Sequence, residues 1–268
     1  MTYPLWVGGS TTRFGSTRGR CTGSATWATC PLPQANDNEA CIEAITEYYR
    51  EIDAAGCRPV SIGGDHSITR GILQAIAGPG ARLTGGEKAC LLHFDAHTDA
   101  YHNIPHFLGA VKSAAHWAAY LVEGGHLDPE HSVQVGIRGN VRSLDWLDPS
   151  YALGYEVVRT VDYDEMGPDR VKELIAERIG DRPLYITFDL DCLDPTVAPG
   201  VANIEAGIEG FGIDQVTDLI RSVRGRNVIG GDVVCLMPTV DSPNAITSYR
   251  AMAVMFEIIS LIVDGAGA

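Results

Sequence analysis

Three short segments of the chain combine carboxylate and imidazole side chains, and each one follows an apolar run. Their sequences are Gly63-Gly64-Asp65-His66-Ser67, Asp95-Ala96-His97-Thr98-Asp99 and Asp189-Leu190-Asp191-Cys192-Leu193-Asp194-Pro195. Residues two apart in an extended chain point to the same side. Asp95, His97 and Asp99 can therefore converge on one point, and so can Asp189 and Asp191. With His66, they form a set of four carboxylates and two imidazoles.

Four clustered carboxylates repel one another in a partly dry site, so a cation has to neutralise them. Two divalent ions bridged by carboxylates fit this charge, and mixed oxygen and nitrogen ligands suit Mn²⁺, with Ni²⁺, Co²⁺ and Zn²⁺ as competitors. A single Asp-X-Asp is usually a solvated turn, and a lone His is usually a core residue. The prediction of a metal centre depends on all three segments occurring in one chain.

Strands and helices alternate along the sequence. Apolar, β-rich runs predict strands over 58–62, 89–94, 132–137, 184–188 and 227–236, and helical patterns cover 67–77, 168–179, 212–223 and 245–263. This alternation predicts one α/β domain over residues 1–268, with a mostly parallel sheet between helices. Ligands of such sheets bind at the carboxyl ends of the strands, which is where two of the three segments fall.

The composition narrows the classes of partner. The 268 residues are 45% hydrophobic, enough for a full core, and 34 acidic against 20 basic residues give a net charge of -14. This balance argues against a nucleic acid or an anionic membrane as partner, because phosphate surfaces need a basic patch. It suits a cationic ligand or a metal, or simply keeps the protein soluble.

The expected location is the cytoplasm. The sequence contains no run of 18 apolar residues, so no membrane span is predicted. The first residues lack the pattern of a secretory signal. The seven cysteines include no CxxC pair, which favours free thiols in a reducing compartment over a disulfide framework.

The three segments resemble the signature motifs of the ureohydrolase family, which includes arginase, agmatinase and guanidinobutyrase. The family pattern GGDHS, DAHxD and DxDxLDPxxAPG is present in that order, and the third motif continues through Thr196-Val197-Ala198-Pro199-Gly200. Residues 127–138 resemble the agmatinase branch. The resemblance extends from about Ile42 to Val263, and the first 40 residues look like a shortened form of the family's N-terminal segment.

The resemblance implies a three-layer α/β/α sandwich, a homo-oligomer (a trimer or hexamer) and two Mn²⁺ ions held by six ligands. His66, Asp95, Asp99 and Asp191 match positions that bind one ion, and His97 and Asp189 complete the second. Asp95 and Asp191 would be among the bridging ligands.

The activity implied is amidinohydrolysis of a linear guanidino or amidino compound. A hydroxide bridging the two ions would attack the trigonal carbon of the substrate. Asp99 would take its proton and pass it to the leaving amine, giving urea, or a urea-like product, and an amine.

One departure from the family concerns a loop histidine. A His-Gly pair of the agmatinase-like branch falls here on Ala114-Ala115, and the nearest imidazole is His116. His102 and His106 lie in the same loop. One of the three takes over the catalytic role, with His116 the first candidate, or the role is absent; for each alone, a surface histidine is the ordinary interpretation.

Two further departures concern substrate binding. The family loop GTGTPxxGG is replaced by residues 201–210, where Asn203 and Glu205 are candidates to contact substrate; Glu209 is an alternative carboxylate, and a solvated loop acid is the simpler interpretation. The family Glu that pairs with the guanidinium of the substrate is replaced by Cys235.

A neutral thiol at position 235 cannot form that charge-assisted contact. We therefore expect an altered substrate, with agmatine and arginine poor; a reactive thiol is the sharper alternative.

A different class of function also fits the altered pocket. The chain could be a non-catalytic paralogue that acts as an accessory or regulatory subunit. The complete set of six ligands favours the enzyme, and turnover on guanidino compounds distinguishes the two.

Overall fold

The structure, a computed structural model, describes residues 12–15, 21–24, 29–32, 34–102, 105, 112–139, 144–206 and 209–265. It separates into two compact units, Met1–Pro31 and Leu32–Ala268. In the first unit, β1 (Thr12–Gly15) pairs antiparallel with β2 (Cys21–Ser24). The second unit carries everything described below. That residues 1–268 form a single domain stays a prediction.

A six-stranded parallel sheet is the centre of the second unit, in the order β3-β8-β7-β4-β5-β6. The strands are β3 (Val60–Ile62), β4 (Cys90–Phe94), β5 (Val133–Ile137), β6 (Glu156–Arg159), β7 (Leu184–Asp189) and β8 (Val228–Val234). Strands β4, β5, β7 and β8 are buried along their whole length. Continuous apolar runs of this kind form strands covered on both faces.

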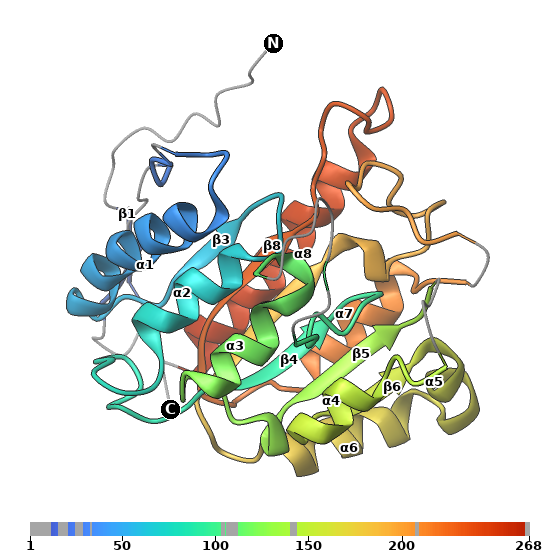
Figure 1. Ribbon diagram of the computed structural model, residues 1–268, viewed down its shortest axis with the longest axis horizontal. Helices are drawn as coiled ribbons and strands as arrows, with labels where there is room; N and C mark the ends of the chain where they lie inside the picture. Colours follow the sequence, from blue (N-terminus) through green and yellow to red (C-terminus); the bar gives the residue numbers. More distant parts are fainter. Residues whose placement is uncertain are drawn as a thin grey trace. The chain divides into compact units, whose positions relative to one another are not determined.

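Helices cover both faces of this sheet, as Figure 1 shows. They are α1 (Asn38–Ala54), α2 (Ile68–Ile76), α3 (Trp117–Glu123), α4 (Asp148–Leu153), α5 (Thr160–Met166), α6 (Pro168–Ile179), α7 (Ile213–Arg221) and α8 (Ile246–Gly265). One layer contains α1, α2 and α3, packed in that sequence; α6, α7 and α8 pack in the other. The expected three-layer α/β/α sandwich with a parallel sheet is confirmed.

The order of the strands reverses between β4 and β7. From β4 the chain continues to β5 and β6 on one side, and from β7 it continues to β8 on the other. Ligands of open α/β sheets bind in the crevice at the carboxyl ends of strands at such a point. Phe94 of β4 is in register with Phe188 of β7, and Phe188 with Val233 of β8. Asp95, Asp189 and the residues just after β8 therefore leave the sheet at the same level.

All nine predicted strands and helices are present, with ends that differ by one or two residues. The sequence patterns did not identify α1, α3, α4, α5 or β6. Three of these helices have only six or seven residues and β6 has four, so each is too short to show a periodic pattern.

Among the described residues, one helix is long and apolar enough to cross a membrane by length and composition, namely α8. Core helices of soluble proteins pass the same test. One side of α8 packs on β8 and buries Thr247, Ala251, Val254, Ile258 and Leu261.

Candidate metal centre

All six predicted metal ligands lie together at the carboxyl ends of the central strands. His66 follows β3, Asp95, His97 and Asp99 follow β4, Asp189 ends β7, and Asp191 lies in the 3₁₀ turn η4 (Leu190–Cys192). Five of them are buried, and the side chain of His97 is 30% exposed. The cluster therefore opens toward solvent on the His97 side.

Three hydroxyl groups and a buried carboxylate orient His66. Asp232 accepts hydrogen bonds from Thr187 Oγ1 (2.6 Å), Thr69 Oγ1 (2.8 Å) and Tyr185 OH (2.9 Å). Because the Thr187 hydroxyl proton goes to Asp232, the oxygen of Thr187 accepts from His66 Nε2 at 2.8 Å. The neutral imidazole therefore carries its proton on Nε2 and presents the lone pair of Nδ1 to the cluster, which is the tautomer a metal ion requires.

His66 Nδ1 faces three carboxylates at once. It lies 2.9 Å from Asp95 Oδ2, 3.2 Å from Asp99 Oδ2 and 3.3 Å from Asp189 Oδ2. Yet this buried nitrogen has no partner in hydrogen-bonding geometry. A nitrogen surrounded by carboxylate oxygens but aligned with none of them is what a cation between them would explain, so the residues fit a bound metal.

A second group forms around His97. Its Nδ1 lies 3.2 Å from both Asp95 Oδ1 and Asp191 Oδ2. Asp95 thus contributes one oxygen to each histidine, as a bridging carboxylate would. The grouping differs from expectation in one respect: Asp189 lies beside His66, and Asp191 beside His97. The backbone N–H of Asp191 donates to Asp189 Oδ1 at 2.8 Å within the η4 turn, which turns the two carboxylates in different directions.

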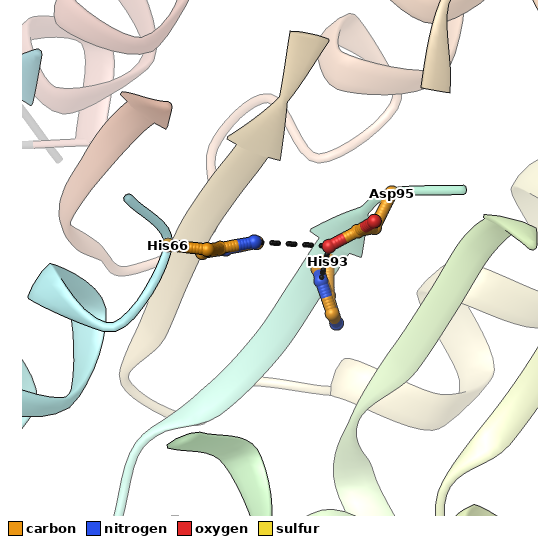
Figure 2. A group of neighbouring side chains, drawn as sticks. All are labelled: His66, His93 and Asp95. Carbon is orange, nitrogen blue, oxygen red and sulfur yellow. Dashed lines mark hydrogen bonds and ion pairs between the residues drawn. The ribbon is translucent and has the colours of Figure 1, made fainter. Parts of the chain in front are cut away.

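His93 is a member of the site that the sequence motifs did not identify (Figure 2). It is completely buried on β4, and its Nε2 lies 2.9 Å from Asp95 Oδ2. The side-chain amide of Gln134 donates to His93 Nδ1 at 3.1 Å, so Nε2 carries the proton that Asp95 accepts. Its position in the sequence could have identified it as a site residue. His93 precedes Asp95 by two residues and is the one polar side chain of an apolar strand.

Asp99 is fixed by its neighbours and by its backbone. Its Oδ2 accepts from Trp117 Nε1 at 2.8 Å, and its backbone oxygen accepts from Ala118 N at 3.1 Å. Its φ of 48° lies in the left-handed region, which Asp tolerates better than most residues. Such strain concentrates at functional sites.

Burial and like charges leave this cluster short of positive charge. Burial and the charge of Asp189 raise the pKa of Asp191 well above its usual range, and burial and Asp95 raise that of Asp99. Burial opposes the charge on His66, but contacts with Asp189, Asp95 and Asp99 outweigh it and raise the pKa of His66 well above normal.

Two of the three predicted substrate residues, Asn203 and Glu205, contact His97 at the open side of the cluster. Glu205 Oε1 is 2.9 Å from His97 Nε2, and Asn203 Nδ2 is 3.2 Å from the same nitrogen. Cys235 directly follows β8, and its sulfur lies within 4.8 Å of carboxylate oxygens of Asp189 and Asp191. Cys235 therefore faces the metal centre. Their role as substrate residues stays a prediction.

Arg138 holds the two loops of the site together. Its guanidinium is buried and donates to the backbone oxygens of Asp191 (2.8 Å), Cys192 (3.2 Å), Leu193 (3.1 Å) and Glu205 (3.4 Å). The loop that carries Glu205 is thereby tied to the turn that carries Asp191, although the two are apart in sequence.

The candidate loop histidines lie differently. His116 Nδ1 contacts Ser113, at 3.2 Å from its N and 3.0 Å from its Oγ, and the next residue, Trp117, is the one that contacts Asp99. His102 Nδ1 lies 3.3 Å from Glu123. His106 lies outside the described residues. A catalytic role for His116 stays a prediction.

Comparison with known proteins assigns the class: the arginase family model matches residues 17–260, and the chain belongs to the arginase family. It is 34% identical to guanidinopropionase from Pseudomonas aeruginosa over 84% of this chain and 67% of that protein. It is 34% identical to an agmatinase from Escherichia coli over 81% of this chain and 64% of that protein. These relatives are hydrolases of guanidino compounds, and the predicted ureohydrolase membership is confirmed.

A solved structure has a similar fold. Proclavaminate amidino hydrolase from Streptomyces clavuligerus is 29% identical and superimposes with a TM-score of 0.75, covering 85% of this chain and 72% of that one. The chain thus spans about two thirds of the length of these relatives. The agmatinase relatives give no support to the expectation that agmatine is excluded.

Proposed function

We propose that the protein is a metal-dependent amidinohydrolase that acts on a linear guanidino or amidino compound and releases urea, or a urea-like product, and an amine. The observation that carries the proposal is the pair of histidines, His66 and His97, whose Nδ1 atoms face opposite oxygens of one buried carboxylate, Asp95. Two ligand groups that share a carboxylate are the arrangement that two-metal hydrolysis uses.

The residues of this chain would hold two divalent ions and serve the reaction around them. His66, Asp95, Asp99 and Asp189 would hold one ion, and His97, Asp95 and Asp191 the other. Mn²⁺ is the first candidate, with Ni²⁺, Co²⁺ or Zn²⁺ as alternatives. When bound, such ions supply Lewis-acid polarisation and make water nucleophilic near neutral pH.

Asp99 is the proposed proton carrier. Trp117 Nε1 holds its Oδ2 in place, and the same oxygen faces the centre of the cluster. It can accept a proton from the attacking water and deliver it to the leaving amine.

The substrate would enter on the His97 side, where the cluster is most exposed. Glu205 is 8% exposed and offers a carboxylate to a guanidinium nitrogen, in place of the family Glu that Cys235 replaces. A carboxylate can form the charge-assisted contact that the thiol cannot. Guanidino acids and agmatine are therefore both candidate substrates.

The test is release of urea and amine, followed by mass spectrometry, from Mn²⁺-loaded protein given 3-guanidinopropionate, 4-guanidinobutyrate, agmatine, arginine and a library of amidines. Asp191→Asn should lower metal affinity and turnover at least about 10–100-fold, as even partners of metal ligands do. Asp181→Asn changes a fully exposed aspartate and serves as the matched control. Folded, metal-loaded protein without turnover on any compound would instead support the non-catalytic paralogue.

We further propose that the protein works as a homo-oligomer in a reducing cytoplasm. Six of the cysteines are free thiols, which suits that compartment: Cys30, Cys41, Cys57, Cys90, Cys192 and Cys235. One face of α8, opposite its buried face, exposes Tyr249, Met252, Phe256, Ile259 and Val263. These residues are spaced alternately by three and four, which is the spacing of a helix–helix seam.

A second copy of the chain fits this face. The seam itself carries no charge, so two acidic chains can meet there without repulsion. An antiparallel pair of α8 helices would bring the seams of the two copies together. A twofold contact between identical surfaces has this property.

A further inference from the structure

Cys235 occupies a position in the metal centre that the six predicted ligands do not explain. Its side chain is buried, with 5% exposure, and its sulfur and oxygens of Asp189 and Asp191 all lie within 4.8 Å of one another. Asp189 ends β7, Asp191 lies in the η4 turn, and Cys235 directly follows β8, the neighbour of β7 in the sheet. Asp189 is in register with Val234, the residue before Cys235.

We propose that the Cys235 thiolate is a further ligand of the dinuclear centre, on the side of Asp189 and Asp191, and that it shifts the centre from Mn²⁺ toward a thiophilic ion such as Zn²⁺ or Co²⁺. The inference rests on the dinuclear centre proposed above. In this proposal Cys235 binds metal. The replacement of the family Glu by Cys235, taken by itself, suggests only a change of substrate.

The backbone holds the thiol in this position. Cys235 has a φ of 67°, in the left-handed region that side chains rarely adopt. Its N–H donates to Gly64 O at 2.7 Å, and its carbonyl oxygen accepts from Ala202 N at 2.9 Å. Backbone strain of this kind persists only where neighbouring contacts impose it, and it clusters at functional sites.

One observation indicates a cation beside the sulfur. His66 Nδ1 is buried, faces the carboxylates of the same cluster and has no hydrogen-bonding partner. Without a metal ion, burial and the charges of Asp189 and Asp191 raise the pKa of the Cys235 thiol far above its usual range. A thiol placed between two carboxylates gains from being anionic only if a metal ion is present.

The chemistry of the ligands then decides the metal. Mn²⁺ prefers oxygen ligands, whereas thiolate ligands select softer ions such as Zn²⁺. When the ion binds, the sulfur–metal bond forms and the thiol proton passes to solvent, because a coordinating cysteine must be deprotonated. A thiol left without metal could not replace the family carboxylate, since it carries no charge to pair with a guanidinium.

The experiment is a cobalt titration of the full chain, followed by absorption spectroscopy and elemental analysis. Thiolate ligation should give a sulfur-to-cobalt charge-transfer band in the near ultraviolet, separate from the visible bands of the ion. Cys235→Ser and Cys235→Ala should lose this band and still bind Co²⁺. Cys192→Ala removes a second buried cysteine, next to Asp191 in sequence, and should keep it.

Competition between Zn²⁺ and Mn²⁺ gives an independent measurement. The ratio of Zn²⁺ to Mn²⁺ affinity should fall at least about 10-fold in Cys235→Ser, the lower end of the change that follows loss of a metal-site partner. Bound cobalt without the band, or a band that survives in Cys235→Ala, would overturn the inference and leave the metal centre standing. Absence of cobalt binding to folded wild-type protein would overturn both.

Discussion

At the residue scale, His93 shows how the site holds the carboxylate of Asp95. Asp95 accepts from His93 Nε2 and faces His66 with the same oxygen (Figure 2). Partners that orient a metal ligand are worth about 10–100-fold in metal affinity. We expect His93→Phe, which keeps a ring beside Trp117 but removes the N–H, to weaken Mn²⁺ binding by that factor in calorimetric titrations.

The control is His131→Asn, which alters a half-exposed histidine that pairs with Asp128 away from the cluster. It should leave the Kd for Mn²⁺ unchanged. A folded His93→Phe protein with the wild-type Kd would mean that His93 contributes packing and nothing to the metal.

The convergence of the six candidate ligands was predictable from spacing, but their pairing was not. Asp95, His97 and Asp99 follow a strand and lie two apart, so convergence could be expected. Which of Asp189 and Asp191 lies beside His66 depends on the η4 turn, and a 3₁₀ turn of three residues leaves no periodic pattern. The contact of Glu205 with His97 depends on the path of a loop, which residue types do not determine.

At the scale of elements, Asp241 anchors the start of α8. Its carboxylate accepts from the backbone N–H groups of Thr247 (3.1 Å) and Ser248 (3.0 Å) and from the Ser248 hydroxyl. Partial burial acts in the opposite direction, but these hydrogen bonds lower the pKa of Asp241 to about 2. Helix-capping groups of this kind contribute about 0.5–2 kcal/mol to the free energy of unfolding.

We therefore expect Asp241→Asn to lower stability by about 1 kcal/mol near neutral pH. Because the pKa in the folded protein lies below the ordinary value of about 3.9, the stabilisation is present above that pH and lost as the pH falls toward about 2. Denaturant unfolding at pH 7, 4 and 3 should show the difference between wild type and variant shrinking in that order. Asp181→Asn should show no such trend; a constant difference would mean that charge is not involved.

Long and short elements differ in how well the sequence predicts them. Apart from α1, the long strands and helices of the sheet and its covering layers carry clear periodicity or continuous apolar runs, and their patterns identify them. Strand β6 and helices α3 to α5 do not, because short elements depend on the surrounding fold for their stability.

At the scale of the whole molecule, the exposed face of α8 should decide the oligomeric state. Phe256 is 66% exposed at the centre of the seam. A charge there would be buried without a partner on association, at a cost that exceeds what one apolar contact contributes. Phe256→Glu should therefore lower the mass measured by light scattering to that of a smaller species.

Tyr151→Glu is the matched control, because Tyr151 is 52% exposed on α4. It should leave the mass unchanged. A wild-type protein that is monomeric, or a Phe256→Glu protein of unchanged mass, would contradict the proposal. Binding of either to lipid vesicles would indicate a membrane as the partner of α8.

The strand order gives the metal centre one more property. His66 follows β3, the first strand of the sheet, and Cys235 follows β8, the last, yet β3 and β8 are neighbours. The first and last parts of the sheet must meet before the cluster is complete, and contacts between such distant segments form slowly. Metal ions held by this cluster would then bind the finished sheet. Their binding free energy would protect the native state and slow its unfolding.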